Sequence, residues 1–132
     1  MSEKKLEGAG LRGQVAGKTS LSTVGKAGKG LTYRGYPIET LSEKAKFEEV
    51  AYLLMYGSLP NANEYESYSK KLISMRSLPE TILEVLERIP ASAHPMDVMR
   101  TGCSMLGNIE PEGEFSNQQH SANRILATMA SI

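Results

Sequence analysis

Two histidines and one cysteine are the side chains of this 132-residue sequence best suited to catalysis or metal binding. A zinc site needs three or four closely spaced ligands, and His94 has only Asp97 nearby, while His120 stands apart. A nucleophilic cysteine needs a polarised position beside a base, whereas Cys103 falls in an apolar helical stripe. The sequence therefore predicts no metal site, a buried thiol at Cys103 and a helix-start position for His94.

A Gly-Lys-Thr triplet at residues 17–19 has the residue types that end a phosphate-binding loop. Such a loop needs another glycine five positions before Gly17, and Arg12 stands there instead. The later glycines of this region also miss the spacing of a dinucleotide-binding fingerprint. We interpret residues 8–30 as a basic, glycine-rich region and not as a nucleotide site.

Carboxylates and basic side chains provide weaker candidates. The glutamates at 48–49 lie on the polar side of a predicted helix and those at 110–114 lie in a predicted loop, so solvated surface is the simplest interpretation. Lys70, Lys71 and Arg76 cluster on and just after one helix, where they could bind an anion or simply cover an exposed face. The residues alone predict no self-contained catalytic constellation.

The elements that must position these residues are mainly helices that follow a small N-terminal β-hairpin. Residues 20–24 and 31–33 predict the two strands, with a glycine-rich turn at 25–30 between them. Apolar residues at helical spacing then predict about five helices. These are predicted to begin at Phe47, at an Asn63 cap, after Pro79, after His94 and at Gln118, with a loop at 108–115 before the last.

The predicted inner faces of the helices consist of apolar residues three or four positions apart. The predicted inner-face residues are Tyr65, Tyr68, Leu72 and Met75 in the second helix, Ile82, Val85, Leu86 and Ile89 in the third, Met96, Met99, Cys103 and Leu106 in the fourth, and Ile125, Leu126 and Met129 in the fifth. The last helix is still periodic at Ile132 without a capping residue, so we expect the sequence to stop inside a longer helix. Residues 1–9 are predicted to be a disordered tail.

Composition excludes several classes of protein. Lysine plus arginine equals aspartate plus glutamate at 15 each, which argues against a nucleic-acid or acidic-membrane partner. The apolar runs are too short for a transmembrane helix, and no export signal is recognisable. A single cysteine excludes an internal disulfide and fits a reducing compartment. We therefore predict a cytoplasmic globular protein with one domain.

Two stretches of the sequence resemble the citrate synthase family. The first is LTYRGYPI at 31–38, followed by LSEKAKFEEVAYLLMYGSLP, and the second is HPMDVMRTG at 94–102, followed after one residue by SMLG. The second stretch, with LSTVGKAG at 21–28, resembles the branch of the family that forms 2-methylcitrate. The resemblance implies that residues 10–132 are the N-terminal segment, about a third, of a family member. They would belong to its large helical domain, with the rest of that domain and the small domain absent.

The resemblance implies condensation of propionyl-CoA with oxaloacetate and water to 2-methylcitrate and CoA, with acetyl-CoA giving citrate as a secondary activity. It also implies a homodimer and no cofactor, because the CoA thioester is itself a substrate. The family's catalytic aspartate and histidines are expected in the absent C-terminal part. We therefore expect no catalytic residue in this chain and no activity from residues 1–132 alone.

Substrate contact within this segment is expected, if anywhere, on the helix that contains Lys71 and precedes Arg76, whose positive charges suit a carboxylate. Two alternatives to the 2-methylcitrate branch remain at this point. The chain could belong to a citrate synthase proper, or it could be a non-catalytic helical fragment that binds a full-length subunit.

Overall fold

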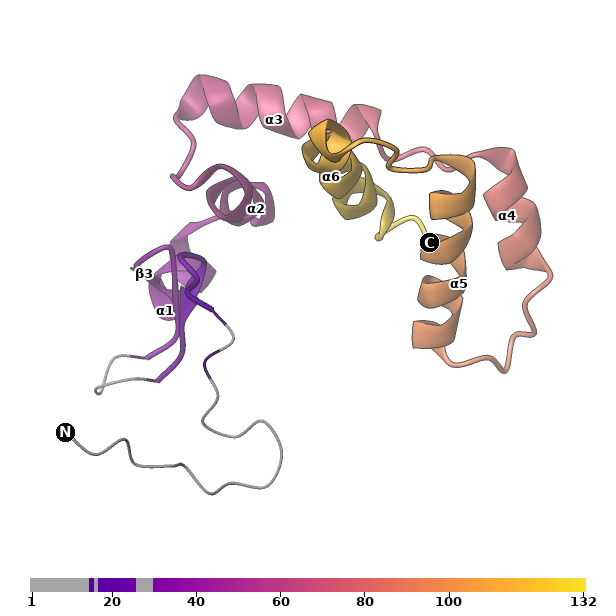
Figure 1. Ribbon diagram of the computed structural model, residues 1–132, viewed down its shortest axis with the longest axis horizontal. Helices are drawn as coiled ribbons and strands as arrows, with labels where there is room; N and C mark the ends of the chain where they lie inside the picture. Colours follow the sequence, from indigo (N-terminus) through magenta and orange to yellow (C-terminus); the bar gives the residue numbers. More distant parts are fainter. Residues whose placement is uncertain (1–14, 16, 26–29) are drawn as a thin grey trace.

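The computed structural model describes residues 15, 17–25 and 30–132, and the predicted tail at 1–9 and most of the glycine-rich turn lie outside this part (Figure 1). In the described part the fold is mainly helical, as predicted, with a small sheet at its N-terminal end. The elements are β1 (Ser22–Thr23), β2 (Thr32–Tyr33), β3 (Tyr36–Pro37), α1 (Ile38–Lys44), α2 (Phe47–Tyr56), α3 (Ala62–Ser74), α4 (Glu80–Glu87), α5 (Pro95–Ile109), a 3-10 turn (Phe115–Asn117) and α6 (Gln118–Thr128).

The sheet has three antiparallel strands in the order β1–β2–β3, one strand more than the predicted hairpin. β2 and β3 are joined by Arg34 at φ 49° and Gly35 at φ 90°, the left-handed pair that a tight two-residue turn requires. Nη1 of Arg34 donates to Ser20 Oγ at 2.6 Å and Nη2 donates to the Leu54 carbonyl at 3.1 Å. The turn arginine therefore fastens the sheet to α2.

Helix α2 begins at Phe47 as predicted and ends at a left-handed glycine. Gly57 has φ 96° and its N–H donates to the Leu53 carbonyl at 2.9 Å. The preceding α1 was not predicted, because a seven-residue helix with one buried side chain, Leu41, is too short to show a period.

We expect Gly57→Ala to lower the free energy of unfolding by about 1 kcal/mol, because alanine is strained in the left-handed region. Gly107→Ala is the matched control, since Gly107 lies inside α5 and an added Cβ would meet nothing within 4 Å. The control should leave stability unchanged or raise it by up to about 0.5 kcal/mol. Urea unfolding of both variants measures the difference, and losses of equal size would contradict the assigned role of Gly57.

The cap of α3 lies two residues before the predicted position. Oδ1 of Asn61, and not Asn63, accepts from the backbone N–H groups of Asn63 and Glu64 at 3.0 Å each. Glu64 Oε2 in turn accepts from the Asn61 N–H at 2.8 Å. Asn63, the predicted cap, also has a glutamate three positions later, Glu66, but Asn61 directly follows the break at Pro60 and so begins the helix.

The core lies where α2, α3 and α6 meet, and Figure 1 shows α3 linking this region to α4 and α5. Tyr68 and Leu72 of α3 are buried there, as predicted. The ring of Tyr68 packs edge-on against Tyr52 and Tyr56 of α2, with centroids 5.3 Å and 5.7 Å apart. Burial raises the pKa of Tyr68 to about 12, so its hydroxyl remains a hydrogen-bond donor.

The inner face of α6 differs from the prediction. Ile125, placed on that face by periodicity, is 41% exposed, whereas Asn123 and Thr128 are fully buried. Asn123 Oδ1 accepts from the Tyr68 hydroxyl at 2.8 Å, and its Nδ2 donates to the Gln119 carbonyl at 2.8 Å. A buried polar side chain needs hydrogen-bond partners of this kind. Periodicity within α6 could not reveal them, because Tyr68 lies on a different helix.

Helices α4 and α5 pack against each other. Ile82 of α4 and Leu106 of α5 are both buried, as predicted. Met96 was also placed inside, but it is 63% exposed. It lies in the first turn of α5, at the end of this helix farthest from α6 (Figure 1). In the part of the chain that the structure describes, no helix combines the length and apolarity needed to cross a membrane.

Candidate functional site

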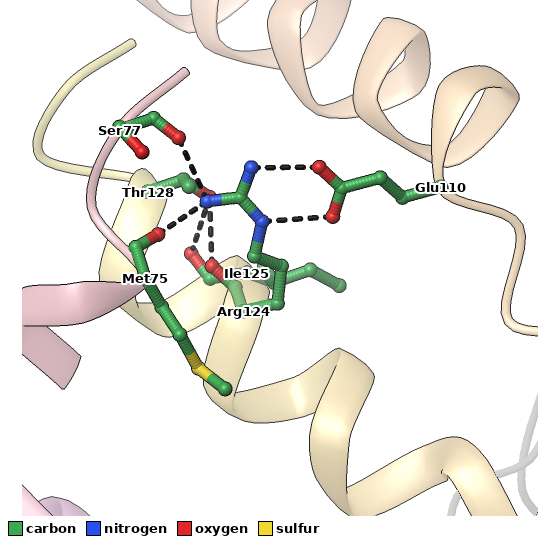
Figure 2. Close-up of polar contacts among 6 residues, drawn as sticks. All are labelled: Met75, Ser77, Glu110, Arg124, Ile125 and Thr128. Carbon is green, nitrogen blue, oxygen red and sulfur yellow. Dashed lines mark hydrogen bonds and ion pairs between the residues drawn. The ribbon is translucent and has the colours of Figure 1, made fainter. Parts of the chain in front are cut away.

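Arg124 of α6 joins three segments of the chain (Figure 2). Its Nε and Nη2 donate to the two carboxylate oxygens of Glu110, at the end of α5, at 2.8 Å and 2.7 Å. Its Nη1 donates to the carbonyls of Met75 and Ser77, which follow α3, and the Ser77 bond is 2.9 Å long. One guanidinium therefore fixes the ends of α3 and α5 against α6.

The electrostatics of this pair favour the charged state. Hydrogen bonds from Arg124 hold the pKa of Glu110 below its ordinary value of 4.5, although burial opposes this shift. The Arg124 side chain is 13% exposed and that of Glu110 is 35% exposed. Glu110 is exposed and lies just after α5, as predicted, but the sequence did not indicate its pairing with Arg124, because that partner is 14 positions away.

A cavity of about 630 Å³ lies between α5 and α6 beside this pair. Its lining includes the apolar or weakly polar residues Cys103, Leu106, Gly107 and Ile125 and the polar residues Glu110, Glu112, Asn117, His120 and Arg124. Pockets of about 300–1,000 Å³ with convergent polar groups are typical of small-molecule sites. The sequence alone did not reveal this cavity, because its residues come from two helices and the loop between them.

The residues first considered for chemistry are scattered. His94 caps α5, where its Nδ1 accepts from the Met96 N–H at 3.2 Å, which confirms its helix-start position. Cys103 is half-buried and lines the α5–α6 cavity, so it is less enclosed than predicted. Among the described residues, no three histidine, cysteine, aspartate or glutamate side chains are grouped so that they could hold a metal ion.

Lys71 and Arg76 do not converge on one cavity. Lys71 is exposed and lines a groove of about 380 Å³ between α2 and α3, together with the tyrosines of the core. Arg76 lies outside that lining, and its Nη2 is 3.7 Å from Oε1 of Glu48. The ammonium group of Lys71 is the better placed of the two for an anionic ligand, and the substrate-binding role of both residues stays a prediction.

Comparison with known proteins places this geometry in a family. The model of the family described as "Citrate synthase, C-terminal domain" matches residues 10–132. The 2-methylcitrate synthase of Shewanella oneidensis is 64% identical over 129 residues, which are 98% of this chain and 34% of that protein.

Solved structures share the fold. Citrate synthase from Thermotoga maritima MSB8 has a TM-score of 0.78 and 32% identity, over 91% of this chain and 31% of that one. Citrate synthase from Thermoplasma acidophilum, in a ternary complex with carboxymethyl coenzyme A and oxaloacetate, has a TM-score of 0.82. Its 20% identity over 92% of this chain and 32% of that one shows the fold alone.

The chain thus spans about a third of the length of these proteins. The YRGY and HPMDVMRTG stretches lie in the matched region, which includes every helix and strand described above. Because the family model matches residues 10–132 and the fold agrees, the chain belongs to the citrate synthase family.

Proposed function

We propose that this chain is part of a 2-methylcitrate synthase. The observation that carries the proposal is its 64% identity to the Shewanella oneidensis enzyme over nearly all of its residues. The whole enzyme condenses propionyl-CoA with oxaloacetate and water, releasing 2-methylcitrate and CoA, and makes citrate from acetyl-CoA as a secondary activity. It needs no metal or redox cofactor, because the thioester supplies the driving force. The single cysteine fits a cytoplasmic location.

In this proposal residues 10–132 are the N-terminal segment of the large helical domain and are inactive alone. Among the described residues, 13 large hydrophobic side chains are exposed and only eight hydrophobic residues are buried. Exposed apolar surface on this scale marks contact with other protein. We assign this surface to the remainder of the subunit and to the second subunit of a homodimer.

The roles of Arg124 and His94 within the fold also support the proposed inactivity of the segment. The condensation needs a carboxylate base, histidines that stabilise the enol and polarise the carbonyl, and arginines that hold carboxylates. The guanidinium of Arg124 instead donates to Glu110 and to main-chain carbonyls of the chain itself, and His94 caps α5.

The experiment that tests this function compares propionyl-CoA with acetyl-CoA. The native gene product, purified from its own cells, is assayed for CoA release with oxaloacetate and each thioester. We expect a higher kcat/KM with propionyl-CoA. A clear preference for acetyl-CoA would assign the chain to a citrate synthase proper, which the 32% identity to the Thermotoga maritima enzyme makes the second candidate.

We expect Lys71→Met in that product to raise the KM for oxaloacetate about fivefold, through loss of a charge-assisted contact to a carboxylate. Lys70→Met is the matched control, because Lys70 lies next to Lys71 on α3 and pairs with Glu66 at 2.6 Å. The control should leave the KM unchanged. An unchanged KM in Lys71→Met would remove the substrate-binding role of Lys71.

The exposed apolar surface favours one further candidate, a non-catalytic fragment that binds a full-length subunit. A pull-down of the intact synthase with the tagged 132-residue chain tests it. Co-purification in equal amounts would support this role, and its absence would remove the motive for it.

A further inference from the structure

The helices of the described part pack in two groups. Helices α2, α3 and α6 pack around one buried cluster, which includes Tyr68 and Leu72 of α3, and we call this group the body. Helices α4 and α5 pack against each other beside the body (Figure 1). Each of these two helices has a buried apolar side chain, Ile82 in α4 and Leu106 in α5. The α4–α5 pair is therefore distinct from the body in its packing.

The α4–α5 pair is also one continuous piece of the chain. It spans residues 80–109, and the segments 75–79 and 110–114 connect it to α3 on one side and, through the 3-10 turn, to α6 on the other. Because α3 and α6 pack against each other, both ends of the pair stay anchored when it leaves the body. Units that open separately in folded proteins are commonly continuous supersecondary motifs of this kind.

The surface between this pair and the body is incompletely filled. The cavity of about 630 Å³ lies between α5 and α6. Close packing is normal inside proteins, and atoms that line an empty space lack dispersion contacts on that side. Separation of α5 from α6 therefore costs less contact energy than separation of α3 from α6, where Tyr68, Leu72 and Ala127 are buried.

Two side-chain contacts, which we call latches, hold the pair to the body, and Arg124 of α6 makes the first. Its guanidinium donates to the carbonyls of Met75 and Ser77 in one connecting segment and to the carboxylate of Glu110 in the other. The N–H of Glu110 donates to the Leu106 carbonyl at 2.8 Å, so Glu110 moves with α5. Opening of the pair therefore has to break the contact between Arg124 and Glu110.

The contact of Ile132 with Gly102 is the second latch. The N–H of Ile132 donates to the Thr128 carbonyl of α6 at 3.2 Å, so Ile132 moves with the body. Gly102 is buried in α5, and a Cβ at this position would lie 2.5 Å from Cγ2 of Ile132. The Ile132 side chain therefore reaches α5 because residue 102 has no side chain of its own.

We propose that α4 and α5 form a latched unit, which opens from the body and unfolds as a whole while α2, α3 and α6 stay folded. Helices of eight and 15 residues are marginal in water by themselves, so release from the body melts them. The hydrogen bond between Tyr68 and Asn123 lies within the body and survives the opening. The opening is independent of the condensing activity proposed above.

Amide hydrogen exchange of the 132-residue chain, measured residue by residue by NMR, separates this opening from global unfolding. Leu86 in α4 and Leu106 in α5 report the unit, and Leu72 in α3 reports the body. We expect Leu86 and Leu106 to have the same opening constant, at least about tenfold larger than that of Leu72. Different constants at Leu86 and Leu106, or one constant shared by all three amides, would overturn the proposal.

Tyr68→Phe locates the boundary of the unit. It removes the hydroxyl that donates to Asn123 within the body, so it should raise the opening constant of Leu72 about fivefold. The opening constants of Leu86 and Leu106 should change by less than about twofold, because the body is still folded in the opened state. Equal changes at all three amides would mean that the chain unfolds as one unit, which contradicts the proposal.

Gly102→Ala tests the second latch, and Gly107→Ala is the matched control. Both add a methyl group inside α5, but the group at residue 102 meets Ile132, whereas the group at residue 107 meets no described atom within 4 Å. Relative to the control, Gly102→Ala should raise the opening constants of Leu86 and Leu106 about fivefold. Equal constants in the two variants would contradict the latch at Gly102. Absence of protection at every amide of α2, α3 and α6 would contradict the folded body.

Discussion

Arg124→Met should lower the free energy of unfolding of the chain by about 2 kcal/mol. Methionine fills much of the same volume, so the loss comes mainly from polar groups left without donors. These groups are the Glu110 carboxylate and the carbonyls of Met75 and Ser77 (Figure 2). Because Glu110 is exposed, water can solvate its carboxylate in the variant, and the loss stays below the range for fully buried ion pairs. Urea unfolding followed by circular dichroism measures it.

Arg100→Met is the control for this substitution. Nη2 of Arg100 is 3.0 Å from Oδ1 of Asp97, but the Arg100 side chain is 78% exposed. We expect a loss below about 0.5 kcal/mol, as for other exposed ion pairs. If Arg100→Met and Arg124→Met destabilise the chain equally, Arg124 does not have the connecting role assigned to it.

The same pair makes stability depend on pH. The pKa of Glu110 is lowered in the folded chain, so its contribution is present above the ordinary value of 4.5 and is lost as the pH falls through the folded pKa. Arg124→Met removes the cause of this shift. The difference in unfolding free energy between wild type and variant should therefore narrow below pH 4.5, and a constant difference would contradict the lowered pKa.

Asn123→Leu should lower the free energy of unfolding by about 2–3 kcal/mol. Leucine has a similar volume, but it leaves the buried Tyr68 hydroxyl without the acceptor that Asn123 Oδ1 provides at 2.8 Å. The Gln119 carbonyl loses its donor as well. Chemical unfolding at neutral pH is the appropriate measurement, because Tyr68 stays protonated there.

Asn108→Leu is the control for Asn123→Leu, because it removes a similar hydrogen bond at an exposed position. Asn108 Nδ2 donates to the Ser104 carbonyl four residues earlier at 3.0 Å, as Asn123 does to Gln119, but Asn108 is exposed. Its replacement should change stability by less than about 0.5 kcal/mol.

Adding Tyr68→Phe to Asn123→Leu removes the unpaired hydroxyl, so the double variant should lose less stability than the sum of the losses in the two single variants. Additive losses would exclude the Tyr68–Asn123 bond as the cause.

The parts of the fold that could be predicted are those with local causes. The α2 and α3 helices follow from apolar residues at helical spacing, and the end of α2 follows from Gly57. The short elements α1 and β3 contain too few residues to show a period. The resemblance to the 2-methylcitrate branch followed from two short motifs, at 21–28 and 94–102, and not from periodicity.

The candidate site could not be predicted in the same way. Arg124 and Glu110 are polar residues at unremarkable positions, and polarity alone indicates exposed surface. A faint signal existed in α6, where Asn123 and Thr128 interrupt the apolar stripe on what proves to be the buried face. Periodicity gave that face to Ile125 instead, because a search for apolar residues ignores polar groups with buried partners.

The most direct test of the central claim is CoA release from propionyl-CoA and oxaloacetate, with the purified 132-residue chain assayed beside the native gene product. We expect activity to co-purify with a polypeptide about three times the 14.4 kDa of this chain, and none from the chain itself. CoA release by the 132-residue chain alone would contradict the claim that it is an inactive part of a larger condensing enzyme.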